Sequence, residues 1–164
     1  MRECEQLQLG DAMKTIDHLQ TMALTYQEIC QGERPWTALG NFMNDWFDYA
    51  KDRRAQLVAD PISLPEGFNL DPDTHRWAAF CAASVEYLCG RYEVPCPSWA
   101  HNSAYCLPEP WFDSLGAHKP EVRTRLIQQT PEPFTRRNIY CGNRMFANKY
   151  EIAEQYRRLS LTIP

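Results

Sequence analysis

The stretch DPDTHRWAAFCAASVEYLCGR, residues 71–91, decides the fold class. Asp71 is a residue type that caps helices, and Pro72 suits the first helical turn, where its missing N–H leaves no hydrogen bond unmade. Gly90 gives a weak stop signal in the last turn. The stretch therefore predicts a long helix over 72–90. We expect its apolar face to be buried in a core through Trp77, Phe80, Cys81, Val85 and Leu88.

Two further helices are predicted upstream of this stretch. Residues 5–31 carry apolar side chains at alternating spacings of three and four, which is typical of one helical face, and Gly32 is suited to end the helix. Residues 35–59 begin with a first-turn proline and carry a second apolar face. The part from residue 53 continues this helix, straight or bent, until Asp60-Pro61 stops it.

The chain beyond residue 91 divides into a proline-rich segment, 92–133, and a basic segment, 134–164. Seven prolines exclude long elements from the first segment, so we expect short turns, with one short helix around 121–129. The second segment ends in a predicted helix over 145–159, whose apolar stripe would be Phe146, Tyr150, Ala153 and Tyr156, and no alternating strand pattern of convincing length is found. We therefore predict an all-α fold over 1–164. It is a single-domain helical bundle with the proline-rich irregular segment wrapped around it and the terminal helix closing it.

The charge is distributed unevenly along the 164 residues, whose net value is −4. Residues 119–164 carry nine Lys or Arg against four Asp or Glu, a net +5. Residues 1–118 carry eight against seventeen, a net −9. Such a chain either binds a polyanion through its basic end or folds that end onto its acidic body. We favour the second interpretation.

The cysteine count and the hydropathy pattern predict a cytoplasmic protein. The seven cysteines are an odd number, and the polar N-terminal residues lack the apolar stretch of a signal peptide. We therefore expect reduced thiols, most of them buried. No run of 18 apolar residues occurs, so we expect no membrane association.

One set of residues has the composition of a metal site. Cys89, Cys96, His101 and Cys106 form the pattern C-x6-C-x4-H-x4-C, but the closely spaced cysteine pair of most structural zinc sites is missing. We favour buried thiols and one polar histidine, with no metal and no cofactor. No phosphate-binding loop, dinucleotide fingerprint or H-E-x-x-H motif is found, so no catalytic residue is predicted.

The segment TPEPFTRRNIYCGNRMFANKY, residues 130–150, concentrates cations among aromatic rings. Cations that bind phosphate and rings that stack on bases are typical of nucleic-acid binding. The alternative is structural, with Arg136 and Arg137 paired to the acidic body, and we favour it. If the segment meets a partner, Arg137 and Arg144 are the contacts we expect. The full set of candidate partner- or phosphate-binding residues is Arg136, Arg137, Asn138, Asn143, Arg144 and Lys149.

Four segments together resemble a known family. They are residues 33–61, residues 75–89, the LPEPWF box at 107–112 and TPEPFTRRNIYCGNR at 130–144. They are similar to a family of small uncharacterised bacterial proteins encoded beside nucleotidyltransferase-like genes of toxin–antitoxin or mobile-element type. The resemblance covers about residues 33–144, carries over no catalytic residue and implies an accessory or antitoxin-like role.

The predicted function is therefore a protein-interaction module, an antitoxin-like or accessory partner of a protein from a neighbouring gene in a bacterial toxin–antitoxin or defence-type system. Its acidic face would meet a basic site on that partner, because complementary charge speeds association. The alternatives are a nucleic-acid-binding regulator that acts through the basic segment, and a thiol- or metal-dependent hydrolase.

Overall fold

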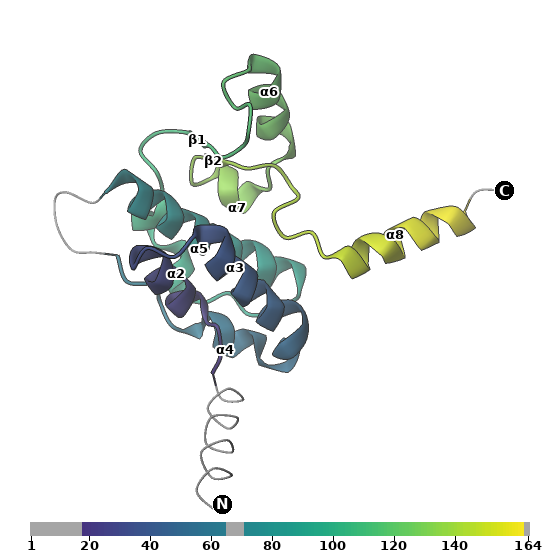
Figure 1. Cartoon of the computed structure of the whole chain (residues 1–164), viewed down its shortest axis with the longest axis horizontal. Helices are drawn as coiled ribbons and strands as arrows, with labels where there is room; N and C mark the ends of the chain where they lie inside the picture. The colour runs from purple at the N-terminus through teal and green to yellow at the C-terminus, as the bar shows by residue number, and fades with distance from the viewer. Residues whose placement is uncertain (1–17, 65–70, 163–164) are drawn as a thin grey trace, which may run out of the picture.

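The computed structural model describes residues 18–64 and 71–162, apart from the side chains of Lys149 and Tyr150 (Figure 1). The described chain is predominantly α-helical, as predicted, with one two-stranded sheet. None of its helices is both long enough and apolar enough to cross a membrane. The α-helices and strands are α2 (Met22–Cys30), α3 (Pro35–Asn44), α4 (Arg54–Ala59), α5 (Pro72–Arg91), β1 (Trp111–Phe112), α6 (Pro120–Gln129), α7 (Glu132–Thr135), β2 (Ile139–Tyr140) and α8 (Lys149–Leu161).

Helix α5 is the centre of the packing and forms where the sequence predicts it. The Asp71 carboxylate accepts a hydrogen bond from the backbone N–H of Thr74 at 3.1 Å, and Pro72 occupies the first turn. Every residue from Ala78 to Val85 is buried, because α2, α7 and two short 3₁₀ turns pack around the helix. The 3₁₀ turns are Ser98–His101 and Ser103–Tyr105.

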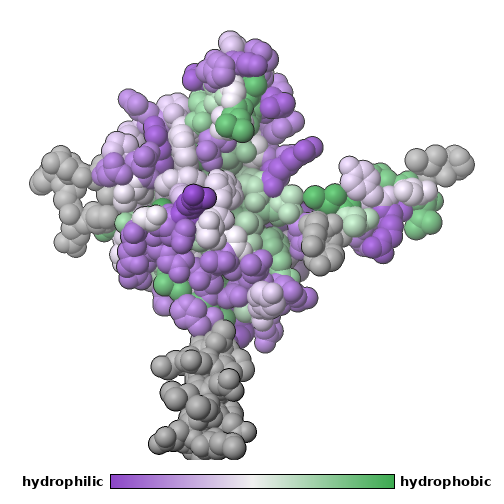
Figure 2. All heavy atoms as spheres, viewed as in Figure 1, coloured by the Kyte–Doolittle hydropathy of each residue, from purple (hydrophilic) through white to green (hydrophobic). Residues whose placement is uncertain are grey.

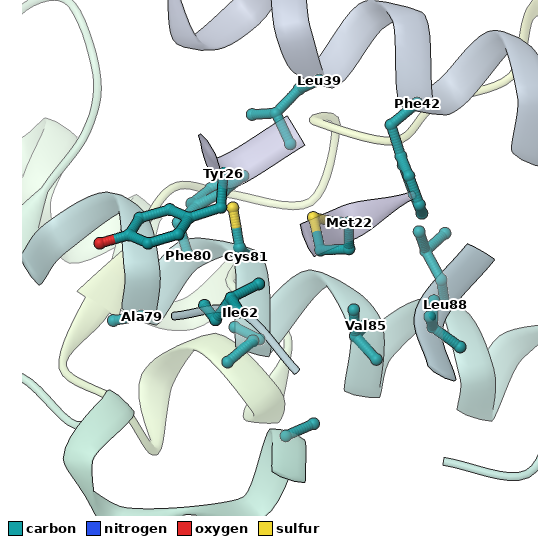
Figure 3. Packing of buried hydrophobic residues seen from close by; sticks show 14 of the residues in the cluster. Met22, Tyr26, Leu39, Phe42, Ile62, Ala79, Phe80, Cys81, Val85 and Leu88 are labelled. Carbon is teal, nitrogen blue, oxygen red and sulfur yellow. The ribbon is translucent and has the colours of Figure 1, made fainter. Parts of the chain in front are cut away.

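The core joins α5 to α2 and α3, as Figure 3 shows for Met22, Leu39 and Phe42 facing Val85 and Leu88. All five of these side chains are fully buried. Burying each of the large ones stabilises the fold by about 1.5–3 kcal/mol relative to exposure. The aliphatic and aromatic positions that the sequence assigns to the apolar faces therefore provide the main stabilisation of the body.

The predicted helix over 5–31 is wrong in its continuity. Residues 1–17 lie outside the described residues, and residues 18–21 are not helical. Thr21 instead caps α2, with its Oγ1 accepting a hydrogen bond from the N–H of Leu24 at 3.1 Å. The N–H of Gln20 donates to the Asp45 carboxylate at 2.8 Å, which holds the preceding chain in a non-helical path. Gly32, at φ +102°, follows the helix end as predicted.

The predicted helix over 35–59 has the right ends but is not continuous. After α3, Asp45–Tyr49 form one turn of π-helix, closed by a bond from the N–H of Ala50 to the carbonyl of Asp45. Ala50 leaves the helical region at φ −133° and ψ 36°, and the 3₁₀ turn Lys51–Arg53 leads into α4. The Arg54 guanidinium then packs over the Trp46 ring and donates to its carbonyl at 3.0 Å. This tertiary contact stabilises the bend.

The proline-rich segment packs against the body through hydrogen bonds from its aromatic rings. The Trp99 Nε1–H donates to the carbonyl of Val58 at 2.9 Å, and the Tyr105 hydroxyl donates to that of Ile62 at 3.0 Å. The short helix predicted around 121–129 is confirmed as α6. The only strands of the described residues are two residues long, with Trp111 paired in parallel to Ile139, which is too short to give an alternating pattern in the sequence.

Helix α8 does not close the bundle, contrary to the prediction. It runs over 149–161 rather than 145–159 and projects away from the body (Figure 1). Phe146, which the sequence assigns to the apolar face of this helix, lies before it and is buried in the core. The core is completed by Phe146, so the helix that follows is left at the edge of the molecule.

Candidate interaction site

Glu86 on α5 binds the first two arginines of the basic segment. Arg137 donates from Nη1 to the Glu86 carboxylate at 2.7 Å, and Arg136 donates to the other oxygen of the same group. Burial alone would raise the pKa of Glu86, but the hydrogen bonds and charges of Arg137 and Arg136 together hold it below its ordinary value. The basic end is thus folded onto the acidic body at this point, as we favoured from the sequence.

Arg137, one of the two residues that we expect to contact a partner, is an internal side chain. Only 4% of the residue is exposed. Besides Glu86, its guanidinium donates to the carbonyls of Pro133 and Ala100, both at 2.6 Å. An external phosphate would have to displace these bonds. Three acceptors in the body therefore already bind the guanidinium of Arg137.

Asn138, another candidate contact residue, has a structural role. It adopts φ +62°, a conformation that asparagine tolerates better than most residues. Its Nδ2 donates to the carbonyl of Leu107 at 2.7 Å, and its own carbonyl accepts the N–H of Trp111 at 2.8 Å. Asn138 thereby joins the LPEPWF box, residues 107–112, to the segment 130–144.

The four candidate metal ligands are not brought into one cluster. Cys89 and Cys96 lie close together, while His101 faces Glu86, with 3.9 Å from its Nδ1 to the carboxylate. Cys106 is exposed. Within residues 18–64 and 71–162, no group of three or more His, Cys, Asp or Glu is placed to hold a metal ion.

The buried thiols are not activated as nucleophiles. Burial and the neighbouring Cys96 raise the pKa of Cys89 to about 12, and burial with the charge of Asp113 raises that of Cys141 to about 12. A thiol with such a pKa is almost fully protonated at neutral pH, and the thiolate is the reactive form. Cys81 and Cys89 are buried and fit the predicted role of small core residues, whereas Cys30 is exposed, and the prediction that most of the cysteines are buried is wrong for the described ones.

Asn143 and Arg144 face solvent in the turn between β2 and α8, and unlike the exposed Arg136 they are not bound by Glu86. The turn is fixed from below by Thr130, whose Oγ1 accepts the N–H groups of Cys141 at 3.1 Å and Gly142 at 2.8 Å. Lys149 opens α8, and its side chain lies outside the described residues. The exposed remainder of the basic segment therefore begins at Asn143.

A groove of about 570 Å³ lies between the end of α5 and α8, with Asn143 and Arg144 on its rim. The Glu151 carboxylate joins its two walls, accepting hydrogen bonds from Arg91 at 3.0 Å and from the Tyr92 hydroxyl at 2.5 Å. Apolar and aromatic side chains line it from both sides: Tyr87 and Phe146 from the body, and Ile152, Tyr156 and Leu159 from α8.

The face of α8 that lines this groove is apolar and largely exposed. Ile152, Tyr156 and Leu159 follow the i, i+4, i+7 spacing of one helical face, and Tyr156 and Leu159 are 68% and 63% exposed. Glu154 pairs with Arg157 and Arg158 elsewhere on the helix. Figure 2 shows hydrophobic side chains at the surface where α8 leaves the body. We call Ile152, Tyr156 and Leu159 the α8 face.

Sequence reasoning missed the α8 face, although its spacing is visible in the residues. The stripe assigned from the sequence, Phe146, Tyr150, Ala153 and Tyr156, shares only Tyr156 with it. The assignment fails because Phe146 belongs to the core and does not continue into the helix. The spacing of Ile152, Tyr156 and Leu159 was the available signal.

Comparison of the chain with models of protein families, with curated proteins and with solved structures finds no match. The resemblance to neighbours of nucleotidyltransferase-like genes thus stays a prediction.

Proposed function

We propose that the chain is a protein-interaction module of the bacterial cytoplasm, an antitoxin-like or accessory partner of a protein from a neighbouring gene. The observation that supports this is the α8 face, an apolar stripe on a projecting helix beside a groove. A helix of 13 residues is marginal in water on its own, and helices in proteins obtain most of their stability by packing an apolar face. The α8 face is a part of the described surface where such packing is incomplete.

The occupant that fits this surface is an amphipathic helix of the partner, laid along the groove. Helix-in-groove recognition uses apolar anchors at the spacing of one helical face, and the α8 face offers the complementary anchors. Arg144 on the rim has no charged partner in the described ranges, so the helix should carry an acidic residue beside its apolar anchors. This surface differs from the acidic face that the sequence favours for docking.

The nucleic-acid alternative has less support, because Arg136 and Arg137 are already paired with Glu86. A surface that binds a polyanion relies on several exposed cations along the backbone. The hydrolase alternative has no specific observation in its favour.

The test is capture of a partner by the tagged full-length chain from its own cells, compared with a matched pair of variants. Leu159→Asp lies in the α8 face, whereas Leu161→Asp changes a leucine two residues away that is 87% exposed and outside the groove. We expect the original chain and Leu161→Asp each to capture one protein in stoichiometric amount, and we expect this capture to persist after nuclease treatment. The variant Leu159→Asp should retain at least about tenfold less, since a charge cannot be buried unpaired in an apolar contact.

The captured protein is then purified and titrated with each variant by calorimetry. Equal affinity for Leu159→Asp and the original chain would overturn the proposal, as would capture that nuclease abolishes. Light scattering of the purified chain gives a second check. If self-association is lost in Leu159→Asp and no other protein binds, the occupant is a second copy and not a partner.

A further inference from the structure

A second hollow, of about 420 Å³, lies between α6 and the turn that precedes α8. Arg125 and Gln129 line it from α6, and Asn143 and Arg144 line it from the turn. Its floor is formed by Leu126, Cys141 and Gly142. Arg125 does not line the groove beside α8, so the two cavities can be tested separately.

The two arginines of this hollow differ from most arginines of the described residues, because their guanidinium groups have no partner among the described side chains and carbonyls. Nearly all arginines of the described ranges donate hydrogen bonds or form ion pairs, for example Arg123 to the carbonyl of Ala117 at 2.6 Å. Arg34, Arg125 and Arg144 are the exceptions in residues 18–64 and 71–162, and two of these three line the hollow. No Asp or Glu is among the residues that line it.

The backbone beneath the two arginines is held in place. Gly142 adopts φ +77°, and its N–H is fixed by the Thr130 hydroxyl. A Cβ at Gly142 would stand 3.6 Å from Leu126, so the turn lies directly on α6. A turn that is already ordered loses little entropy when a ligand binds, which favours recognition.

We propose that this hollow binds the phosphate group of a small molecule. A guanidinium presents several donors in a planar fork that matches phosphate oxygens, and the hollow has one such group on each of two walls. The amides of Gln129 and Asn143 add neutral donors beside them. A tetrahedral, doubly charged phosphate can accept from both walls, whereas a carboxylate has two oxygens in one plane and a single charge.

The surroundings favour a single phosphate group over a nucleic-acid backbone. Four other cations of the basic segment, Arg136, Arg137, Arg157 and Arg158, are paired with Glu86 or Glu154. A polyanion would need a track of free cations, whereas here the two unpaired arginines both line one hollow. The hollow also has more volume than inorganic phosphate fills, so a phosphate ester fits.

The test is a calorimetric and NMR titration of the full-length chain with inorganic phosphate, glycerol 3-phosphate and acetate. We expect both phosphates to bind with a dissociation constant near about 1 mM, the strength of a few charge-assisted hydrogen bonds at a half-open site, and acetate to bind at least about fivefold more weakly. The variants Arg125→Gln and Arg144→Gln should each weaken phosphate binding by about fivefold to tenfold. Arg34→Gln, the matched control with an equally unpaired arginine, should leave it unchanged.

Tighter binding of glycerol 3-phosphate than of inorganic phosphate would identify an ester as the ligand, and equal binding would identify free phosphate. At a phosphate concentration 20-fold above the expected dissociation constant, the site should be nearly saturated. The absence of both heat and a shift of the arginine side-chain resonances at that concentration would overturn the proposal. Equal losses in Arg34→Gln and Arg125→Gln would also overturn it. So would preferential binding of single-stranded DNA with a steep salt dependence. Unchanged melting of each variant shows that the fold is intact.

Discussion

The basic segment contains two regions of similar composition that are used in opposite ways. In the first, Arg136 and Arg137 are bound by Glu86, and Asn138 holds a backbone turn. In the second, Arg144 and the α8 face remain at the surface. The difference shows that composition does not separate a structural cation from an available one. What separates them is whether a part-buried acid on another element lies within reach.

The largest effect on stability is expected from removing the internal cation, Arg137. The variant Arg137→Met keeps a long apolar side chain but leaves Glu86 part-buried with only Arg136 beside it, and it removes the donor to the Ala100 carbonyl. Breaking a buried ion pair on one side costs about 3–5 kcal/mol. We expect a loss of unfolding free energy in that range by urea denaturation. The matched control Arg144→Met should change it by less than about 0.5 kcal/mol.

The pH dependence distinguishes this ion pair from simple packing. Because the pKa of Glu86 is lower in the folded chain than its ordinary value, its charge contributes stability above the ordinary carboxyl pKa. That contribution is lost as the pH falls through the lowered value. The stability difference between the original chain and Arg137→Met should therefore be largest near neutral pH and shrink in acid. A difference that is constant down to the acid transition would assign the loss to packing alone.

Thr130 holds the turn that separates the two regions. Its substitution is expected to give the next largest loss of stability. Its hydroxyl accepts two backbone N–H groups, those of Cys141 and Gly142. The variant Thr130→Val has nearly the same shape but leaves both donors unmatched, at a cost of about 1–3 kcal/mol. The control Thr124→Val, on the exposed side of α6, loses only a bond to the carbonyl of Pro120 and should cost much less. Thermal melting measures both, and equal losses would contradict the assigned role of Thr130.

Sequence patterns locate those parts of this fold that depend on near neighbours. Asp71, Pro72 and the apolar spacing after them place α5 to within one residue, and Pro120 does the same for α6. The sequence leaves open whether 35–59 is straight or bent, because the bend depends on Arg54 packing over Trp46 and Tyr92. Similarly, Glu86 lies about 50 residues from its two arginines, so only the folded chain identifies them as partners.

The candidate site divides in the same way. Asn143 and Arg144 are found from composition alone, since exposed polar residues need no partner to be recognised. The groove and the hollow that these two residues share require the positions of α5, α6 and α8 in space. Arg125 has no distinguishing sequence neighbour, and its role emerges only because α6 faces the turn.

The smallest expected effect concerns the contact between Glu151 and α5. It tests whether this contact positions α8. Glu151 joins the helix to α5 through Arg91 and the Tyr92 hydroxyl, and burial together with Glu151 raises the pKa of that tyrosine to about 12. The variant Glu151→Gln keeps the hydrogen-bonding shape but removes the charge, which for a part-exposed pair costs about 0–1 kcal/mol. We expect global stability to change within that range, while amide hydrogen exchange in 149–161 accelerates and exchange in α5 does not.

The control Glu154→Gln, whose pairs with Arg157 and Arg158 lie within the helix, should leave the attachment to α5 intact. Unchanged exchange in Glu151→Gln would mean that Glu151 does not position α8, and the width of the groove would then be set by the turn at Asn143 and Arg144 alone.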